Sequence, residues 1–94
     1  MVSFRFEYDE AKSRTNKLKH GIDFEEAQGL WSDRRLAAST ARSETEPRIL
    51  VTGMLGGKLW TAVVTWRSDR IRIISVRRAR PREAQAYARQ DHQR

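Results

Sequence analysis

The second half of the chain contains strand-like segments separated by very short turns. Three of them are residues 49–54, 59–66 and 71–76. The turns between them contain Gly56 and Gly57, and then Ser68 and Asp69. Because turns this short join neighbouring strands that run in opposite directions, the region predicts an antiparallel sheet. Residues 36–40 add a weaker strand, and residues 41–47 form a polar loop.

The start of the chain predicts one more strand and a helix. Phe4, Phe6 and Tyr8 alternate with charged residues, which is typical of a half-buried strand. Asp9 can cap a helix that runs to about Lys19, and Gly21 is suited to its end. The expected buried line of this helix is thin, with Ala11, Thr15 and Leu18.

Two further helices are predicted by their starting residues. Asp23 and Glu26 form a capping-box pattern for a second helix that ends near Trp31 or Ser32. Its expected buried stripe is Phe24, Ala27, Leu30 and Trp31. Pro81 suits the first position of a closing helix, with Glu83 in its first turn. The inner face of that helix should hold Ala84, Tyr87 and Ala88.

Together these elements predict one α+β domain over residues 1–94. A chain of 94 residues is too short to divide its apolar side chains between two cores. We expect an antiparallel sheet of about four to five strands, two N-terminal helices and one C-terminal helix. Helices on one face of the sheet would leave the other face open to a ligand.

Composition excludes several classes of protein. The chain has no cysteine, and its two histidines, His20 and His92, are too few and too far apart to suggest a metal site. We therefore expect no metal and no cofactor. No apolar stretch approaches the 18 residues of a membrane span, and residues 1–5 lack the layout of a signal peptide. These features predict a cytoplasmic protein without a membrane partner.

The net charge of +7 lies mostly in the last third of the chain. Residues 67–94 carry nine arginines and three acidic residues, whereas residues 1–33 have a net charge of −2. Guanidinium groups bind phosphate through paired hydrogen bonds, so the pattern favours a nucleic-acid partner. There are two alternatives. The basic surface could pair with an acidic protein, or it could be a solvated face that binds no partner.

Two sets of motifs resemble the BrnT family of toxins. The first set runs from Phe6 to Lys12, with Asn16, and continues through residues 19–22 and 24–27. The second set is the strand of residues 70–79, which resembles the family pattern R-I-R-I-I-S-A-R-x-A. Smaller matches are Gly53, Leu59, Val63, Val64, Thr65, Arg67, Glu83 and Tyr87. The resemblance covers residues 4 to 88, with Tyr8 in place of the usual tryptophan and Val76 in place of alanine.

This resemblance implies a fold and an activity. The fold would be RelE-like, and the activity would be RNA cleavage without a metal. The partner would be a BrnA-type antitoxin in a hetero-oligomer. DNA would be contacted only indirectly, through the antitoxin.

His20 and the two lysines near it are the first candidates for the active site. RNA is cut when a 2′-hydroxyl attacks the adjacent phosphate, which requires positioning, proton transfer and charge stabilisation. His20, at a helix C-terminus where the dipole favours a cation, could donate a proton. Lys12 and Lys19 are two helical turns apart and could reach phosphates. In the structural alternative, His20 only closes the helix and the lysines are solvated.

Arginines of the last strands are the second group of candidates. Strict alternation would place Arg72, Ile74, Val76 and Arg78 on one face and Ile71, Ile73, Ser75 and Arg77 on the other. The pair that faces RNA stays open at this point. We expect catalytic roles for Arg67, Arg72, Arg77 and Arg78 beside Lys19 and His20. The competing interpretation is that these arginines form salt bridges with acids of the first third.

The remaining candidates are polar or aromatic. Ser75 could donate a hydrogen bond to phosphate, and Tyr87 could stack on a base. Glu83 is better explained by helix capping. The tryptophans Trp31, Trp60 and Trp66 are all expected in the core, although each could in principle stack on a base.

Three functions therefore compete. The first is a toxin ribonuclease, and the second is a basic RNA- or DNA-binding module without catalysis. The third is a structural partner of an acidic protein. Salt-dependent binding without cleavage would favour the second, and negligible binding even at low salt would favour the third.

Overall fold

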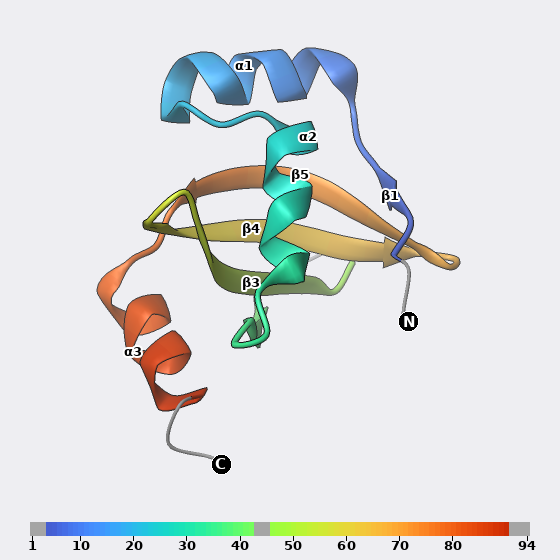
Figure 1. Ribbon diagram of the computed structural model, residues 1–94. Helices are drawn as coiled ribbons and strands as arrows, with labels where there is room; N and C mark the ends of the chain where they lie inside the picture. The colour runs from blue at the N-terminus through green and yellow to red at the C-terminus, as the bar shows by residue number, and fades with distance from the viewer. Residues whose placement is uncertain (1–3, 43–45, 91–94) are drawn as a thin grey trace.

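The computed structural model describes residues 4–42 and 46–90, so His92 and the first three residues lie outside the described part. The chain folds as a sheet with helices around it (Figure 1). The elements in chain order are β1 (Phe6–Glu7), α1 (Glu10–His20), α2 (Phe24–Ala27), the 3₁₀ helix η1 (Gln28–Ser32), β2 (Ala37–Ala41), β3 (Arg48–Leu55), β4 (Lys58–Arg67), β5 (Arg70–Arg78) and α3 (Pro81–Arg89). The α+β class and the order of elements are confirmed, whereas the RelE-like label stays a prediction.

The sheet is mixed rather than purely antiparallel. Its strand order is β1-β5-β4-β3-β2, and the four strands from β2 to β5 form the expected antiparallel meander. The short strand β1 pairs parallel to β5, with Phe6 opposite Ile71. The prediction of an antiparallel sheet was therefore wrong for β1. A parallel neighbour needs a long crossover, and here the rest of the fold separates the two strands in the chain.

The hydrophobic core lies between one face of the sheet and the segment α2–η1. Trp60, Ala62 and Val64 of β4 point toward this segment and define the inner face. They pack with Phe24, Ala27 and Leu30, which are all nearly fully buried. The capping box of Asp23 and Glu26 is present as expected. The predicted second helix is correct in position, but its second half is 3₁₀ rather than α.

Helix α3 lies against the opposite, outer face, which is the face of Thr61, Val63 and Thr65. Glu83 of α3 accepts a hydrogen bond from the hydroxyl of Thr61, at 2.9 Å. The expectation that all helices cover one face was therefore wrong. The chain leaves β5 at its end, and Pro81 starts α3 there, so this helix packs near the ends of β2 and β3.

Helix α1 packs along the edge of β5 that faces away from β4, and it does so through polar side chains. Its buried residues are Ser13 and Asn16, whereas Leu18 is 88% exposed. The side chain of Asn16 donates to the carbonyl of Val76, at 2.9 Å, and accepts from its N–H, at 3.1 Å. The predicted apolar line was therefore wrong. Beyond β1 the edge of β5 offers unpaired backbone groups, and an amide side chain satisfies them where an apolar one cannot.

A bulge in β5 changes which of its side chains share a face. Ser75 is opposite Val63, but Ile73 is opposite Val64, so Ile74 is an extra residue. As a result, Ile71, Ile73 and Val76 all reach the core. The strict alternation predicted for this strand was wrong, because one inserted residue moves every later side chain to the other face.

Trp66 is also placed differently from the expectation. It is 54% exposed at the end of β4, whereas Trp60 is buried as predicted. Trp31 is half-buried and contacts the ring of Phe6 edge-on, with 4.9 Å between ring centroids. Over the described residues, no helix is long and apolar enough to span a membrane.

Candidate functional site

A groove of about 240 Å³ lies between α1 and β5. Lys12, Lys19 and His20 line it from α1, and Ser75 lines it from β5. The other lining residues are Thr15, Asn16, Phe24 and Ile74. Helix α1 lies above β5 in Figure 1 and runs in the same direction. The structure thus brings Ser75 beside the three residues that the sequence had grouped on one helix, and no carboxylate is among the described residues that line the groove.

The two ends of α1 determine where these cations lie. Asp9 caps the start by accepting a hydrogen bond from the N–H of Lys12, at 3.0 Å, and this bond lowers the pKa of Asp9. Gly21 ends the helix with a φ of 83°, a conformation that favours glycine. Lys19 and His20 therefore lie in the last turn, where the unpaired carbonyls of the helix favour positive charge. Both are exposed.

The bulge in β5 places Arg72, Ser75 and Arg77 on the outer face together. Their partners on β4 are Thr65, Val63 and Thr61, which alternate along the outer face. Arg72 and Arg77 thus lie on either side of Ser75, which lines the groove with Lys19 and His20. Arg72 is tied to Glu7 of β1 by an ion pair of 2.9 Å, with 30% of its side chain exposed.

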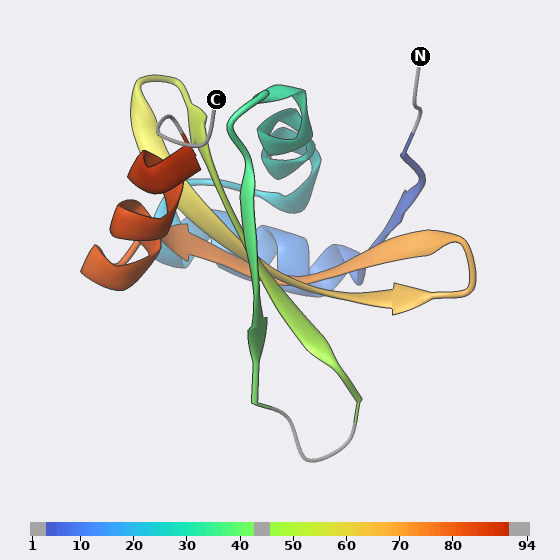
Figure 2. The same ribbon diagram turned by 90° about the horizontal axis from the view of Figure 1, so that it is seen from below.

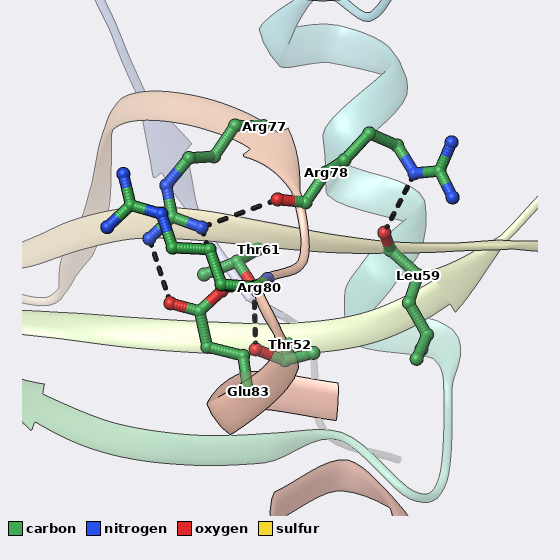
Figure 3. A network of polar contacts seen from close by, with 7 residues as sticks. All are labelled: Thr52, Leu59, Thr61, Arg77, Arg78, Arg80 and Glu83. Atoms are coloured by element: carbon green, nitrogen blue, oxygen red, sulfur yellow. Dashed lines mark hydrogen bonds and ion pairs between the residues drawn. The ribbon is translucent and has the colours of Figure 1, made fainter. Parts of the chain in front are cut away.

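Arg77 is the centre of a polar network beneath α3 (Figure 3). Its two terminal nitrogens donate to the two carboxylate oxygens of Glu83, at 2.7 and 2.8 Å. Glu83 also accepts from Thr61 and from the N–H of Arg80. The hydrogen bond from Arg77 lowers the pKa of Glu83 most, and the other two donors lower it further. Partial burial raises this pKa, but the hydrogen bonds outweigh burial and bring the pKa to about 2. Glu83 is therefore a fixed carboxylate that orients Arg77, and it also caps α3 as expected.

Arg78 and Arg67 lie away from the groove. Arg78 faces the inner side of the sheet, where its guanidinium carbon lies 5.5 Å from the ring centroid of Trp60. Its Nε donates to the carbonyl of Leu59, at 3.3 Å. Arg67 is at the far end of β4, where it approaches Glu46 at 3.7 Å. The four arginines do not form the single cluster that the sequence suggested.

Tyr87 has a structural environment. It is 7% exposed, and its hydroxyl donates to Asp33, at 2.7 Å. Asp33 also accepts from the N–H of Met54 and of Arg35. Partial burial opposes ionisation of Asp33, but these three hydrogen bonds outweigh it and lower its pKa. The pair holds α3 to the turn that follows η1, so Tyr87 does not reach the groove.

Three residues with structural roles in the site or in the elements around it were not proposed from sequence. Asn16 anchors α1 to β5, Glu7 orients Arg72, and Asp33 binds α3. Asn16 was part of the motif that resembles BrnT toxins, which was the available signal. Glu7 and Asp33 gave no local signal, because their partners are 65 and 54 residues away along the chain.

Comparison with known proteins assigns the family. The model of the family described as the ribonuclease toxin BrnT of a type II toxin–antitoxin system matches residues 8–83. The chain belongs to the BrnT family. This membership makes it the ribonuclease toxin of a type II system, whose partner is an antitoxin protein. No curated protein sequence matches the chain. The match includes α1, the whole sheet from β2 to β5 and the start of α3.

The groove offers this BrnT-family chain cations, a hydroxyl and one imidazole on a short stretch of surface. Such a set can bind a phosphodiester, stabilise extra charge on phosphorus and transfer a proton. Within residues 4–42 and 46–90, there is no group of three or more His, Cys, Asp or Glu side chains arranged to hold a metal ion.

Proposed function

We propose that the chain is a toxin endoribonuclease that cleaves RNA in the groove between α1 and β5, without a metal ion. The phosphate would lie between Lys12 and Lys19 of α1 and Ser75 of β5. Arg72 and Arg77 would bind the flanking phosphates on the outer face. Tyr87, Arg67 and Arg78 are left out of this site because their observed contacts hold them elsewhere.

The reaction would use the 2′-hydroxyl of the RNA itself. The 2′-oxygen attacks the adjacent phosphorus, and its proton passes to water. The bond from phosphorus to the 5′-oxygen breaks, and His20 donates a proton to that leaving oxygen. The products are a 2′,3′-cyclic phosphate and a 5′-hydroxyl end. Lys19, next to His20, would stabilise the additional negative charge in the transition state.

One observation carries this proposal: His20, Lys19, Lys12 and Ser75 line one groove that no described carboxylate lines. A cation without a carboxylate partner has all its charge and its N–H donors available to a phosphate. Arg72 and Arg77, by contrast, already use part of their donors on Glu7 and Glu83. Arg77 uses three of its five N–H donors on Glu83 and on the carbonyl of Arg78. Its remaining donors can still bind RNA in an orientation that Glu83 fixes.

Neutralisation would come from a BrnA-type antitoxin in the cytoplasm. A net charge of +7 favours association with an acidic protein surface as well as with RNA. DNA would be bound only by the complex, through the antitoxin. The chain alone would then inhibit growth, and co-expression of its antitoxin would restore it.

Cleavage by the purified protein tests this function. Incubation with RNA in EDTA should give products with cyclic phosphate and 5′-hydroxyl ends. The variant His20→Ala should lose at least about a hundredfold in rate, since general acid catalysis contributes about 10²- to 10⁴-fold. The matched control is Lys58→Ala, because Lys58 is an exposed lysine at the start of β4, away from the groove. Salt-dependent RNA binding without any cleavage would instead indicate a binding module.

A further inference from the structure

Strand β2 is an open edge of the sheet. It is the last strand in the order β1-β5-β4-β3-β2, and no described strand pairs with its outer side. Ala38, Ser39 and Thr40 in its middle are exposed. Figure 2 looks onto this edge, with α3 on one side of β2 and η1 on the other. The opposite edge of the sheet is different, because β1 and Asn16 cover β5 there.

Natural edges are usually protected, and β2 lacks the common protections. Proline, lysine, an inward-pointing charge or a bulge blunts most edge strands. Residues Ala37–Ala41 read AASTA and contain no such residue, and their pairing with β3 has a regular register over all five positions. The small side chains also leave the backbone accessible. A second strand can therefore hydrogen-bond to this edge.

Two grooves of different chemistry flank the edge. On the outer face, a groove of about 510 Å³ lies between β2 and α3, and Arg82, Gln85 and Arg89 line its far side. On the inner face, an apolar groove of about 250 Å³ contains Leu36, Ile49 and the exposed Trp66. Ala38 lines both grooves. Side chains of a strand added to β2 would point alternately to the two faces.

We propose that the antitoxin docks by adding an extended segment to β2, with apolar side chains on the inner face and acidic side chains on the outer face. The proposal rests on the toxin function only in that it takes the partner to be the antitoxin. Its chemistry follows from the flanking residues. The aromatic and aliphatic groove accepts apolar side chains, and Arg82 and Arg89, both exposed on α3, attract carboxylates.

This docking surface is separate from the RNA groove. Lys12, Lys19 and His20 lie beyond β5, whereas β2 is at the other end of the strand order. Antitoxin binding can therefore be altered without removing any residue of the proposed active site. An RNA strand is the competing occupant of the outer groove, since Arg82 and Arg89 could bind phosphate as well.

Amide hydrogen exchange tests the added strand without any substitution. In an edge strand, alternate N–H groups point outward and exchange readily. The free toxin should show this pattern in Ala37–Ala41, and the complex with the antitoxin of its own system should slow those amides by at least about tenfold. A complex that forms while these amides exchange at the free rate would overturn the proposal.

Two charge variants test the outer groove. Arg82→Glu and Arg89→Glu should each weaken antitoxin binding by about tenfold in calorimetry and leave RNA cleavage unchanged. Arg14→Glu on α1 makes the same charge change away from β2 and should leave antitoxin affinity within about twofold. If the α3 variants weaken RNA binding and not antitoxin binding, the groove belongs to RNA and the proposal fails. If the wild-type chain binds the antitoxin as predicted but cleaves no RNA, only the proposed nuclease site is overturned.

Discussion

The side-chain amide of Asn16 takes the place of a neighbouring strand beside Val76. It donates to the carbonyl of Val76 and accepts from its N–H, and it also donates to the carbonyl of Ile22, at 2.8 Å. One buried side chain thus joins α1, the turn before α2 and the edge of β5. The groove of Lys19, His20 and Ser75 exists because this contact fixes α1 along β5.

Removing the amide should destabilise the whole fold. Asn16→Ala leaves three buried backbone groups without their partner, and each unsatisfied group costs about 1 to 3 kcal/mol. Because the groups lie close together and water can reach some of them, we expect a loss of about 2 to 4 kcal/mol in the free energy of unfolding. Urea denaturation of the two proteins measures it. A loss below about 0.5 kcal/mol would show that the contact has no stabilising role.

Leu18 provides the opposite prediction on the same helix. Its side chain is 88% exposed, so Leu18→Ala removes almost no buried area. Leucine and alanine also have similar helix propensities. The free energy of unfolding should change by less than about 0.5 kcal/mol. A cost of about 2 kcal/mol or more would mean that Leu18 is buried after all, as the apolar pattern of the sequence had suggested.

The ion pair between Glu83 and Arg77 should make the free energy of unfolding depend on pH. Because the pKa of Glu83 is lowered to about 2 in the folded chain, its stabilising effect is present above its usual pKa and disappears as the pH falls toward 2. Glu83→Gln should reduce the free energy of unfolding by about 2 to 3 kcal/mol at neutral pH. The difference from the wild type should shrink steadily between about pH 5 and pH 2.

Circular dichroism in urea at several pH values measures this difference. Glu25→Gln is the matched control, because Glu25 is exposed on α2. The control should stay within about 0.5 kcal/mol of the wild type at every pH. A difference for Glu83→Gln that is constant from pH 5 to pH 2 would contradict the ion-pair account.

Gly53 should tolerate a side chain less well than Gly29, because Leu30 of η1 packs directly on β3 there. A Cβ at this position would lie 2.8 Å from a methyl carbon of Leu36 and 3.4 Å from the backbone oxygen of Leu30. Gly53→Ala should therefore cost about 1 to 3 kcal/mol in unfolding free energy, through overpacking. At both glycines the shortest contact is with the end of a leucine side chain, which can move, but at Gly29 only Leu55 is close, at 2.9 Å, whereas at Gly53 the backbone of Leu30 also limits the space. Equal costs for Gly53→Ala and Gly29→Ala in thermal unfolding would contradict this packing.

The arginines should differ in their effect on RNA cleavage. Arg77→Ala and Arg72→Ala remove cations on the outer face beside Ser75, whereas Arg67→Ala and Arg78→Ala remove cations away from the groove. We expect the first pair to reduce the cleavage rate by about ten- to a hundredfold and the second pair by less than about threefold. The variants Arg77→Lys and Arg72→Lys separate charge from geometry, because lysine cannot make the paired contact. Loss of activity in Arg67→Ala alone would move the site to the other end of β4.

The order of elements could be predicted because it depends on local patterns. Turn residues, caps and the alternation of β3 and β4 each act over a few positions, and the structure reproduces them. The pairing of β1 with β5 could not be predicted in this way. It joins Phe6 to Ile71, and nothing near either residue specifies a parallel partner.

The faces of α1 and β5 were predicted wrongly for physical reasons. An apolar line is a good guide to burial only when the surface beneath is apolar, and α1 packs on the polar edge of a strand. In β5, Ile74 and Ser75 give no sign of the bulge, since an inserted residue has no composition of its own. The candidate site was therefore predictable only in part. The helix grouped Lys12, Lys19 and His20, whereas the shared face of Arg72, Ser75 and Arg77 could not be predicted.

Binding of an uncleavable RNA tests the central claim most directly. An oligonucleotide with a 2′-deoxy sugar at the cut site should bind the ¹⁵N-labelled toxin without reaction. The account predicts that backbone amide resonances of Lys19, His20 and Ser75 shift on binding, while those of Arg67 and the turn at Asp69 stay unchanged. Shifts confined to the far end of β4, with none in α1, would contradict it.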